Sequence, residues 1–177
     1  MKKVILYTDG ACSGNPGVGG WGCILEYNGI KKELSGVEAE TTNNRMELMA
    51  VIKGLKAIKE PCEVEVYSDS AYTVNAFTEK WIETWQLNNW KNANKKPVKN
   101  VDLWNELLDL LQIHKVSWHK VKGHSDNEYN NRCDFLATQE IAKYKKYIYL
   151  CNDTTPTKVC INILSRCFID DYLYKKT

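Results

Sequence analysis

The chain has 177 residues, a formal net charge of +2, and 44% hydrophobic and 26% charged residues, an ordinary composition for one globular domain with a sizeable core. No apolar run approaches the roughly 18 residues of a membrane span, and the amino-terminal apolar stretch is too short for a signal peptide, so we expect a cytoplasmic protein without a membrane partner. Seven cysteines without CxxC spacing and only three histidines favour reduced thiols over disulfides or a zinc site.

The first half of the chain predicts an antiparallel start to a sheet, followed by a helix. The expected strands cover residues 3–9, 20–28 and 30–36. Asn28-Gly29 is a strong two-residue hairpin signal between the last two strands. The glycine-rich segment 10–19 is expected to be a loop, which places Asp9 at the end of its strand. The cluster of N-cap residues at 41–44 predicts a helix over about 44–59.

The second half of the chain alternates helices with two further strands. The expected elements are a strand at 64–67, helices at about 70–77 and around 81–85, a lysine-rich loop at 88–99, a helix at 101–113, a strand at 116–121 and a helix at about 127–146. Residues 147–177 show no clear pattern beyond a strand at 159–164. This order indicates an α/β fold, a mixed sheet with helices on its faces, in which a right-handed crossover makes strand 64–67 parallel to strand 3–9.

Four carboxylates on four separate elements meet if this topology holds. Asp9 and Asp69 follow two parallel strands, Glu47 lies in the first turn of the helix 44–59, and Asp134 lies on the last helix. The carboxyl ends of parallel strands share one edge of the sheet, where α/β proteins usually place their chemistry. Four like charges there require protons or cations, and Mg²⁺ prefers oxygen ligands.

Each carboxylate by itself also has a structural interpretation. Asp9-Gly10 is a common turn pair, Asn44-x-x-Glu47 matches a capping box, and Asp69 stands where a helix N-cap would stand. Asp134 fits an exposed charge in a helix interior. The four interpretations are independent of one another, whereas a metal site explains all four residues with one geometric assumption.

The motifs that contain these residues resemble those of bacterial-type ribonuclease HI over about residues 2–143. They are long, ordered and nearly unbroken. The matching motifs are Tyr-Thr-Asp-Gly-Ala-Cys-Ser-Gly-Asn-Pro-Gly (7–17), Thr-Thr-Asn-Asn-Arg-Met-Glu-Leu-Met-Ala (41–50), Ser-Asp-Ser (68–70), Lys-Lys-Pro-Val-Lys-Asn-Val-Asp-Leu-Trp (95–104), Val-Lys-Gly-His (121–124) and Asn-x-Arg-Cys-Asp-x-Leu-Ala (130–137).

The resemblance implies a ribonuclease H-like fold, with a five-stranded mixed sheet in the order 3-2-1-4-5 and helices on both faces. It implies a catalytic domain over 1–146, whose basic arm covers about 80–100, and it leaves 147–177 as an extension of unknown role. The implied activity is endonucleolytic hydrolysis of the RNA strand of RNA–DNA hybrids, leaving 3′-hydroxyl and 5′-phosphate ends, in the removal of RNA primers and R-loops. We expect a monomer.

The resemblance also implies the metal ligands. Asp9, Glu47, Asp69 and Asp134 would bind two Mg²⁺ ions, with Mn²⁺ as the alternative ion, in the two-metal arrangement used for in-line displacement at phosphorus. The residue that matches the catalytic histidine of the family is His124, which would assist proton transfer and product release. A histidine in a glycine loop is otherwise an exposed side chain without a role.

Polar residues beside the carboxylates are candidates for contact with the hybrid. An enzyme that selects RNA in a hybrid must sense the 2′-hydroxyl and the shape of the minor groove. The resemblance implies backbone contacts near the scissile site and a DNA-phosphate pocket that includes Thr42. The candidates are Cys12, Asn15, Thr42, Asn43 and Asn44. Turn and cap chemistry is the alternative role for several of them. Ala71 replaces a glutamine that close relatives often carry, so one minor-groove contact is in doubt.

The basic arm combines lysines with tryptophans. Residues 80–100 hold five lysines and one glutamate, whereas residues 1–79 hold eight basic and eleven acidic side chains. The substrate-binding candidates in the arm are Lys95, Lys96, Lys99, Trp81, Trp85 and Trp90. Four lysines within 91–99 would follow phosphates, and the resemblance implies that the arm grips the DNA strand. The alternatives are a solvated loop for the lysines and core packing for the tryptophans.

Two other functional classes fit parts of the sequence. A non-catalytic hybrid-binding module would keep this fold without the chemistry, but all four carboxylates and His124 are present. An integrase-like DNA strand transferase would share the sheet, but the basic arm and the Val-Lys-Gly-His motif do not support it.

Overall fold

The computed structural model describes residues 1–123 and 127–153, with side chains described as far as Leu150. Residues Met1–Ile141 form one compact unit, and a second unit begins at Ala142, inside the last helix. The elements are β1 (Lys2–Gly14), β2 (Gly17–Tyr27), β3 (Ile30–Thr41), α1 (Asn43–Lys56), β4 (Cys62–Ser68), α2 (Ala71–Thr78), α3 (Trp81–Leu87), α4 (Val101–Ile113), β5 (Lys115–Lys120) and α5 (Glu128–Asp153). Among the described helices, none is both long and apolar enough to cross a membrane.

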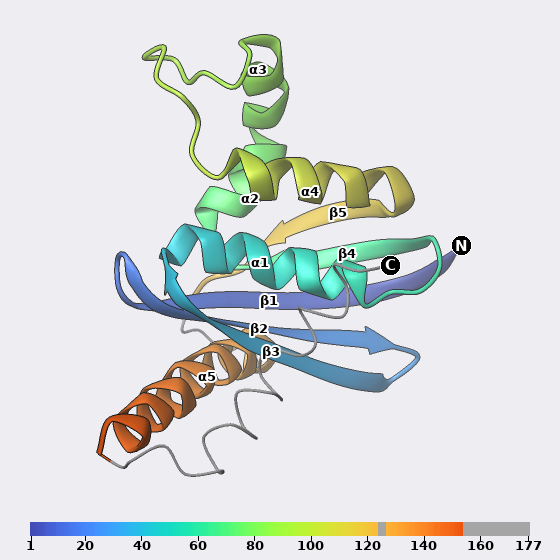
Figure 1. The fold of residues 1–177 in the computed structure, drawn as a ribbon. Coiled ribbons are helices and arrows are strands. Elements are labelled where there is room, and N and C mark those ends of the chain that lie inside the picture. Colours follow the sequence, from blue (N-terminus) through green and yellow to red (C-terminus); the bar gives the residue numbers. More distant parts are fainter. Residues whose placement is uncertain (124–126, 154–177) are drawn as a thin grey trace, which may run out of the picture. The chain divides into compact units, whose positions relative to one another are not determined.

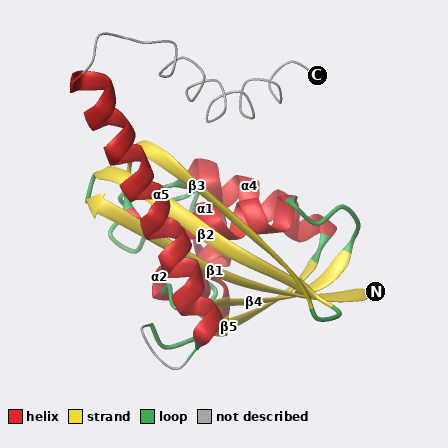
Figure 2. Cartoon of the chain, turned by 90° about the horizontal axis from the view of Figure 1, so that it is seen from below, coloured by secondary structure: helices red, strands yellow, loops and turns green. Residues whose placement is uncertain are grey.

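The five strands form one mixed sheet in the order β3-β2-β1-β4-β5. β1 pairs antiparallel with β2 and parallel with β4; β2–β3 is antiparallel and β4–β5 is parallel. In the first unit, α1, α2 and α4 lie on one face of the sheet, and α5 crosses the other face (Figures 1 and 2). The predicted α/β class, strand order and placement of helices on both faces are therefore confirmed.

Alternating apolar residues of the central strands build the core on the α1 side. Leu6 of β1, Val66 of β4 and Leu48 of α1 are fully buried, as is Trp104 of α4. Burying a side chain of this size stabilises the fold by about 1.5–3 kcal/mol. Gly54 brings α1 close to the sheet, because a Cβ there would lie 2.5 Å from Leu6 Cδ1. The core thus fixes α1 against β1 over most of its length.

The hairpin between β2 and β3 confirms the turn prediction. Asn28 and Gly29 both adopt positive φ, 49° and 76°, as a type I′ turn requires. The two strands pair from Tyr27 and Ile30 outward.

The predicted glycine loop after Asp9 is wrong. β1 continues to Gly14 and β2 begins at Gly17, so only Asn15-Pro16 forms the turn. The glycines of this segment are paired strand residues. Gly10 and Gly19 face α1 and Gly20 faces α5, and glycine in a strand often marks such a close approach of two backbones. Asp9 accordingly lies inside a strand, at the point where the parallel pairing with β4 has ended at Thr8 and Ser68.

Three predicted boundaries also differ. β3 extends five residues beyond the predicted 36, to Thr41, because it follows the lengthened β2. α1 ends at Lys56 rather than 59, ahead of Pro61. α5 runs through residue 146 to Asp153, so the proposed border between a catalytic domain and an extension falls inside a helix. The strand predicted at 159–164 lies outside the described residues.

Candidate active site

Three of the four predicted carboxylates converge at the carboxyl ends of β1's parallel segment and β4. Asp9 and Asp69 are the residues that follow the last parallel pair, Thr8–Ser68, so they are neighbours on the same sheet edge. Glu47 lies on α1, and its side chain is buried. One oxygen of each of these three carboxylates lies within 4.8 Å of the other two. We call Asp9, Glu47 and Asp69 the carboxylate rim.

Asp134 stands beside the carboxylate rim rather than within this 4.8 Å group. It is half-buried on α5, and its charge is close enough to raise the pKa of Asp9. Cys133 and Ala137 of the same helix are fully buried. The predicted exposed charge in a helix interior therefore does not describe Asp134.

Burial and mutual repulsion make the rim favour protons or cations. The pKa of Asp9 is raised to about 8, chiefly by burial and then by the charges of Asp69 and Asp134. Burial, followed by the charges of Asp9 and Asp69, raises the pKa of Glu47 well above its usual value. The Gly10 N–H donates to Asp9 Oδ1 at 2.8 Å and offsets a part of this cost.

The donor set suits a hard divalent cation. Glu47 Oε2 is buried and has no hydrogen-bond partner among the described residues, and leaving such an oxygen unpaired is costly. Carboxylate oxygens from three elements are the ligands that Mg²⁺ and Mn²⁺ accept. The residues present therefore fit a metal site.

Glycines bring the carboxylate-bearing helices close to the sheet. A Cβ on Gly10 would lie 2.4 Å from the Glu47 nitrogen, so α1 reaches β1 only because position 10 has no side chain. Gly22 pairs with Asp9, and a Cβ on it would lie 2.4 Å from the Cys133 carbonyl oxygen of α5. A Cβ on Gly123 would lie 2.5 Å from Asp69 Oδ2. The sequence showed these glycines, but their role requires the helix positions.

The structural alternatives for the rim carboxylates are wrong. The N-cap of α1 is Thr42, whose Oγ1 accepts from the Arg45 N–H at 3.4 Å, so Glu47 closes no capping box. The N-cap of α2 is Ser70, not Asp69. Asp9 lies within β1 rather than in an Asp-Gly turn.

The predicted contact residues cluster around the rim. The Asn43 side chain donates to the Glu47 carboxylate, and Asn15 Oδ1 accepts from the Asn43 N–H at 3.3 Å. Cys12 Sγ lies 3.5 Å from the Thr41 carbonyl oxygen. Asn44 is exposed in the first turn of α1. Asn15, Thr42 and Asn43 therefore make turn or cap bonds and also lie near Glu47. His124 lies outside the described residues.

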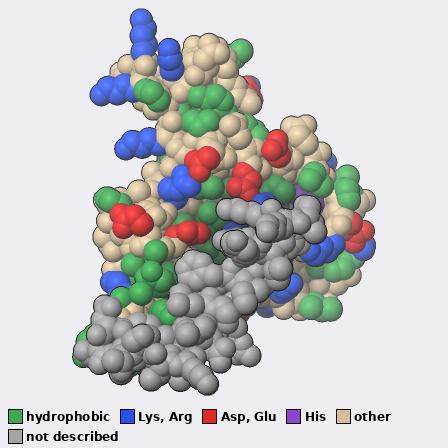
Figure 3. Space-filling view, viewed as in Figure 1, with side chains coloured by type: hydrophobic (Ala, Val, Ile, Leu, Met, Phe, Trp, Pro, Cys, Tyr) green, Lys and Arg blue, Asp and Glu red, His purple; other side chains and the backbone are tan. Residues whose placement is uncertain are grey.

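The basic arm protrudes from the helical face of the sheet (Figure 1), and lysine or arginine side chains project around it (Figure 3). Lys95, Lys96 and Lys99 are exposed. The tryptophans are half-buried and pack against the core, with the Trp85 ring 5.7 Å from that of Trp104. The packing alternative for the tryptophans is confirmed: their rings contact the core of the domain.

A side-chain network that sequence analysis missed joins the foot of the arm to α1. Arg45, two residues before Glu47, forms a bidentate ion pair with Asp102 of α4, at 2.7 and 3.0 Å. Tyr72 Oη accepts from Asn100 Nδ2 at 3.2 Å and from Trp104 Nε1 at 3.1 Å. No spacing in the sequence links these residues, because they come from three elements.

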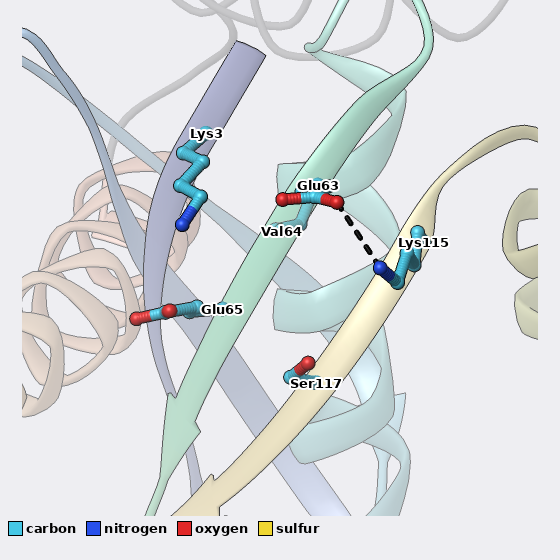
Figure 4. A pocket seen from close by; sticks show the side chains of 6 residues that line it. All are labelled: Lys3, Glu63, Val64, Glu65, Lys115 and Ser117. Atoms are coloured by element: carbon cyan, nitrogen blue, oxygen red, sulfur yellow. Dashed lines mark hydrogen bonds and ion pairs between the residues drawn. The ribbon is translucent and has the colours of Figure 1, made fainter. Parts of the chain in front are cut away.

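The small pocket on the open part of the sheet is not a second site. It lies between Lys3, Glu63, Glu65 and Lys115 (Figure 4), where Lys115 Nζ pairs with Glu63 Oε1 at 3.1 Å. Glu63 precedes Asp69 by six residues, about 20 Å along a strand. The pocket is a shallow, charged part of the sheet surface that contains the Lys115–Glu63 ion pair, and it is remote from the rim.

A carboxylate cluster at the carboxyl ends of parallel strands in a mixed α/β sheet, in a chain with a protruding lysine-rich arm, is typical of metal-binding hydrolases of nucleic-acid phosphodiesters. The sequence model of the RNase H family matches residues 1–142. The chain belongs to the ribonuclease H family, type 1, and its enzyme class is ribonuclease H.

Relatives and solved structures agree with this assignment. The chain is 66% identical over 146 residues to the ribonuclease H of Acetivibrio thermocellus, covering 82% of this chain and 99% of that one. It is 64% identical over 141 residues to that of Chlorobium phaeobacteroides, covering 80% and 97%. The fold resembles LC9-RNase H1, a type 1 RNase H with the type 2 active-site motif, at a TM-score of 0.73 and 30% identity, covering 81% and 74%. It also resembles LC11-RNase H1 in complex with RNA/DNA hybrid, at 0.61 and 25%, covering 80% and 98%.

Proposed function

We propose that the chain hydrolyses the RNA strand of RNA–DNA hybrids endonucleolytically, leaving 3′-hydroxyl and 5′-phosphate ends, and so removes RNA primers and R-loops. The observation that carries the proposal is the convergence of three carboxylates within 4.8 Å, one with an unpaired buried oxygen. The family supports the reaction class, and LC11-RNase H1 was solved with an RNA/DNA hybrid.

Asp9, Glu47, Asp69 and Asp134 would hold two Mg²⁺ ions, or Mn²⁺ in their place. When bound, such ions lower the pKa of a water and stabilise charge on the leaving oxygen. The rim's own contribution is preorganisation: the carboxylates are fixed by α1, β1 and β4 before substrate arrives, so little reorganisation remains. His124 is the proposed group for proton transfer to the leaving oxygen and for product release.

The polar residues around the rim would recognise the hybrid's backbone. Asn15 and Asn43 lie together beside Glu47, where their remaining amide groups suit a 2′-hydroxyl and phosphate oxygens. Thr42 starts α1, and a helix N-terminus favours a phosphate of the DNA strand. Cys12 and Asn44 flank the same surface.

The basic arm would bind the DNA strand through Lys95, Lys96 and Lys99. Trp81, Trp85 and Trp90 are half-buried and pack against the core, and their exposed edges are proposed to contact the same strand. Because the binding is with phosphates, affinity should fall steeply with salt.

The proposed active unit is a monomer that acts in the cytoplasm. All four carboxylates come from one chain, and primers and R-loops arise on chromosomal DNA. Residues 1–146 are proposed to suffice for catalysis, with 147–177 as an extension, and comparing the full chain with one that ends at residue 146 tests this division.

The deciding assay uses a labelled RNA–DNA hybrid with and without Mg²⁺, beside single-stranded RNA and duplex DNA. The expected result is Mg²⁺-dependent cleavage of the RNA strand of the hybrid alone, and its loss in Asp9→Asn. Cleavage by Asp9→Asn as fast as by the wild type would contradict the mechanism. Tight hybrid binding without turnover would instead indicate a binding module.

A further inference from the structure

The lysine loop of the basic arm is folded around one residue, Asn92, through both its side chain and its backbone. Asn92 Oδ1 accepts from the backbone N–H groups of Asn94 and Lys96, both at 3.0 Å. The Asn92 N–H donates to the Lys96 carbonyl at 2.9 Å, and its own carbonyl accepts from the Lys95 N–H at 2.8 Å. Four hydrogen bonds thus converge on one residue, which is half-buried between exposed neighbours.

These bonds fix the backbone of the two lysines at the tip. Lys95 adopts φ of 59°, a left-handed conformation that ordinarily costs a non-glycine residue about 1 kcal/mol. Its N–H bond to the Asn92 backbone carbonyl offsets a part of that cost. Lys96 is bonded to Asn92 through both its N–H and its carbonyl. The two side chains are exposed and leave the loop from a defined backbone.

The base of the loop is held by backbone bonds that do not involve the Asn92 side chain. Lys91 and Pro97 form a β-bridge, and the Val98 N–H donates to the Trp90 carbonyl at 2.8 Å. The Trp90 N–H in turn donates to the Trp85 carbonyl at 2.7 Å. Loss of the Asn92 side chain should therefore free the tip without unfolding the arm.

We propose that Asn92 is a positioning residue for substrate binding, which holds Lys95 and Lys96 in the arrangement that contacts successive phosphates of one nucleic-acid strand. The inference rests on the proposed function of the arm as the site for the DNA strand. Its physical basis is preorganisation: a loop that is already ordered loses less conformational entropy when its lysines bind. The carboxylate rim does not depend on it.

Two pairs of variants separate loop geometry from charge. Asn92→Ala removes the acceptor, whereas Asn94→Ala removes an exposed amide two residues away whose side chain makes no hydrogen bond within the described residues. Asn92→Asp and Asn94→Asp add the same charge at both positions, but Asn92→Asp keeps an oxygen that accepts the two N–H bonds. The probe is a labelled RNA–DNA hybrid, with cleavage measured in Mg²⁺ and binding measured in EDTA.

Asn92→Ala should raise KM about 3- to 10-fold with kcat unchanged, and should lower the slope of log Kd against log salt by about 1–2, since one contact contributes about 0.9. Asn94→Ala should match the wild type in both, and the two Asp variants should weaken binding equally. Melting temperatures of all four variants should agree within about 2 °C.

Equal KM and salt slopes for Asn92→Ala and Asn94→Ala would overturn the positioning role while leaving the proposed function intact. A fall in kcat for Asn92→Ala at unchanged KM would also overturn it. Failure of the wild type to cleave or bind the hybrid would refute the proposed function instead, so the two failures are distinguishable.

Discussion

The carboxylate rim is held by backbone packing between helices and the sheet, whereas the lysine loop of the basic arm is held by hydrogen bonds within the loop. In the rim, glycines at positions 10 and 22 let α1 and α5 approach β1 and β2 to contact distance. In the arm, Asn92 organises exposed lysines with local bonds. Buried like charges must be held rigidly to bind a cation, whereas phosphate-binding lysines stay exposed on an ordered backbone.

This difference predicts that damage to the rim's frame changes chemistry and stability together, whereas damage to the arm changes affinity alone. The variants below test that division, and they run from the largest expected effect to the smallest.

Gly10→Ala should have the largest effect. The new Cβ would overlap the backbone of α1 at 2.4 Å from the Glu47 nitrogen and 2.5 Å from the Met46 carbonyl carbon, neither of which can rotate away. We expect a loss of about 1–3 kcal/mol in the free energy of unfolding and a fall in kcat of about 100-fold, because Glu47 is displaced. Chemical denaturation and hybrid cleavage measure the two.

Gly54→Ala is the matched control for Gly10→Ala. Its Cβ would also crowd a close neighbour, at 2.5 Å, but this is the Leu6 side chain, away from the rim. It should lose stability while kcat stays within about twofold of the wild type. Equal kcat losses in both variants would show that the glycine at position 10 has no particular link to the chemistry.

Gly22→Ala should weaken the binding of Mg²⁺. The added Cβ meets the Cys133 carbonyl oxygen at 2.4 Å and pushes α5, which carries Asp134, away from Asp9. We expect the Mg²⁺ concentration for half-maximal activity to rise about 10-fold, as for other changes that misplace metal ligands. A Mg²⁺ titration of hybrid cleavage measures it, with Gly36→Ala, which crowds the Trp21 ring, as the control. An unchanged Mg²⁺ requirement would show that the packing of α5 against β2 does not affect metal binding.

The raised carboxyl pKa values predict how the metal-free protein responds to pH. Folded Asp9, with a pKa of about 8, keeps a proton that the unfolded chain releases near 3.8. Its stabilising contribution is therefore complete below the unfolded pKa and is lost as pH rises toward 8. The raised pKa of Glu47 acts in the same direction.

The melting temperature in EDTA should accordingly fall by roughly 5 °C or more between pH 5 and 8. Asp9→Asn should show a shallower fall, since it removes one of the titrating groups, and Mg²⁺ should restore the wild type most at pH 8. Parallel curves for the wild type and Asp9→Asn would refute the shifted pKa.

The Arg45–Asp102 pair is the direct link between the two regions and should have the smallest effect. Asp102 is exposed, so the pair contributes at most about 1 kcal/mol. Arg45→Ala should raise KM about 2- to 3-fold by loosening the foot of the arm against α1. A double-mutant cycle with Asp102→Ala should give a coupling free energy of about 0.5 kcal/mol, and a coupling of zero would separate the arm from the rim.

The sequence predicted the parts of the fold that depend on strong local signals. Asn28-Gly29 forces positive φ at two successive positions, so the hairpin follows from chemistry alone. Asp9 and Asp69 were found because parallel neighbouring strands bring their ends together, whatever their exact lengths. The helix 101–113 was located within one residue by its apolar stripe.

The errors arose where tertiary packing decides what a residue does. Gly10 and Gly19 have the composition of a loop, but they are paired strand residues against which α1 packs. Asn44-x-x-Glu47 matches a capping box, yet the helix starts two residues earlier, at the cap Thr42, and this frees Glu47 for the rim. Asn92 gave no signal, since an asparagine in a polar loop looks the same whether it is solvated or bonded four times.

The most direct test of the central claim is a calorimetric Mg²⁺ titration of the wild type and Asp9→Asn, paired with hybrid cleavage under the same conditions. Because Asp9 is central to the rim, the wild type should bind Mg²⁺ and cleave the RNA strand, and Asp9→Asn should lose measurable Mg²⁺ binding together with at least about 100-fold in kcat. Unchanged Mg²⁺ binding and cleavage in Asp9→Asn would contradict the carboxylate rim as the catalytic centre.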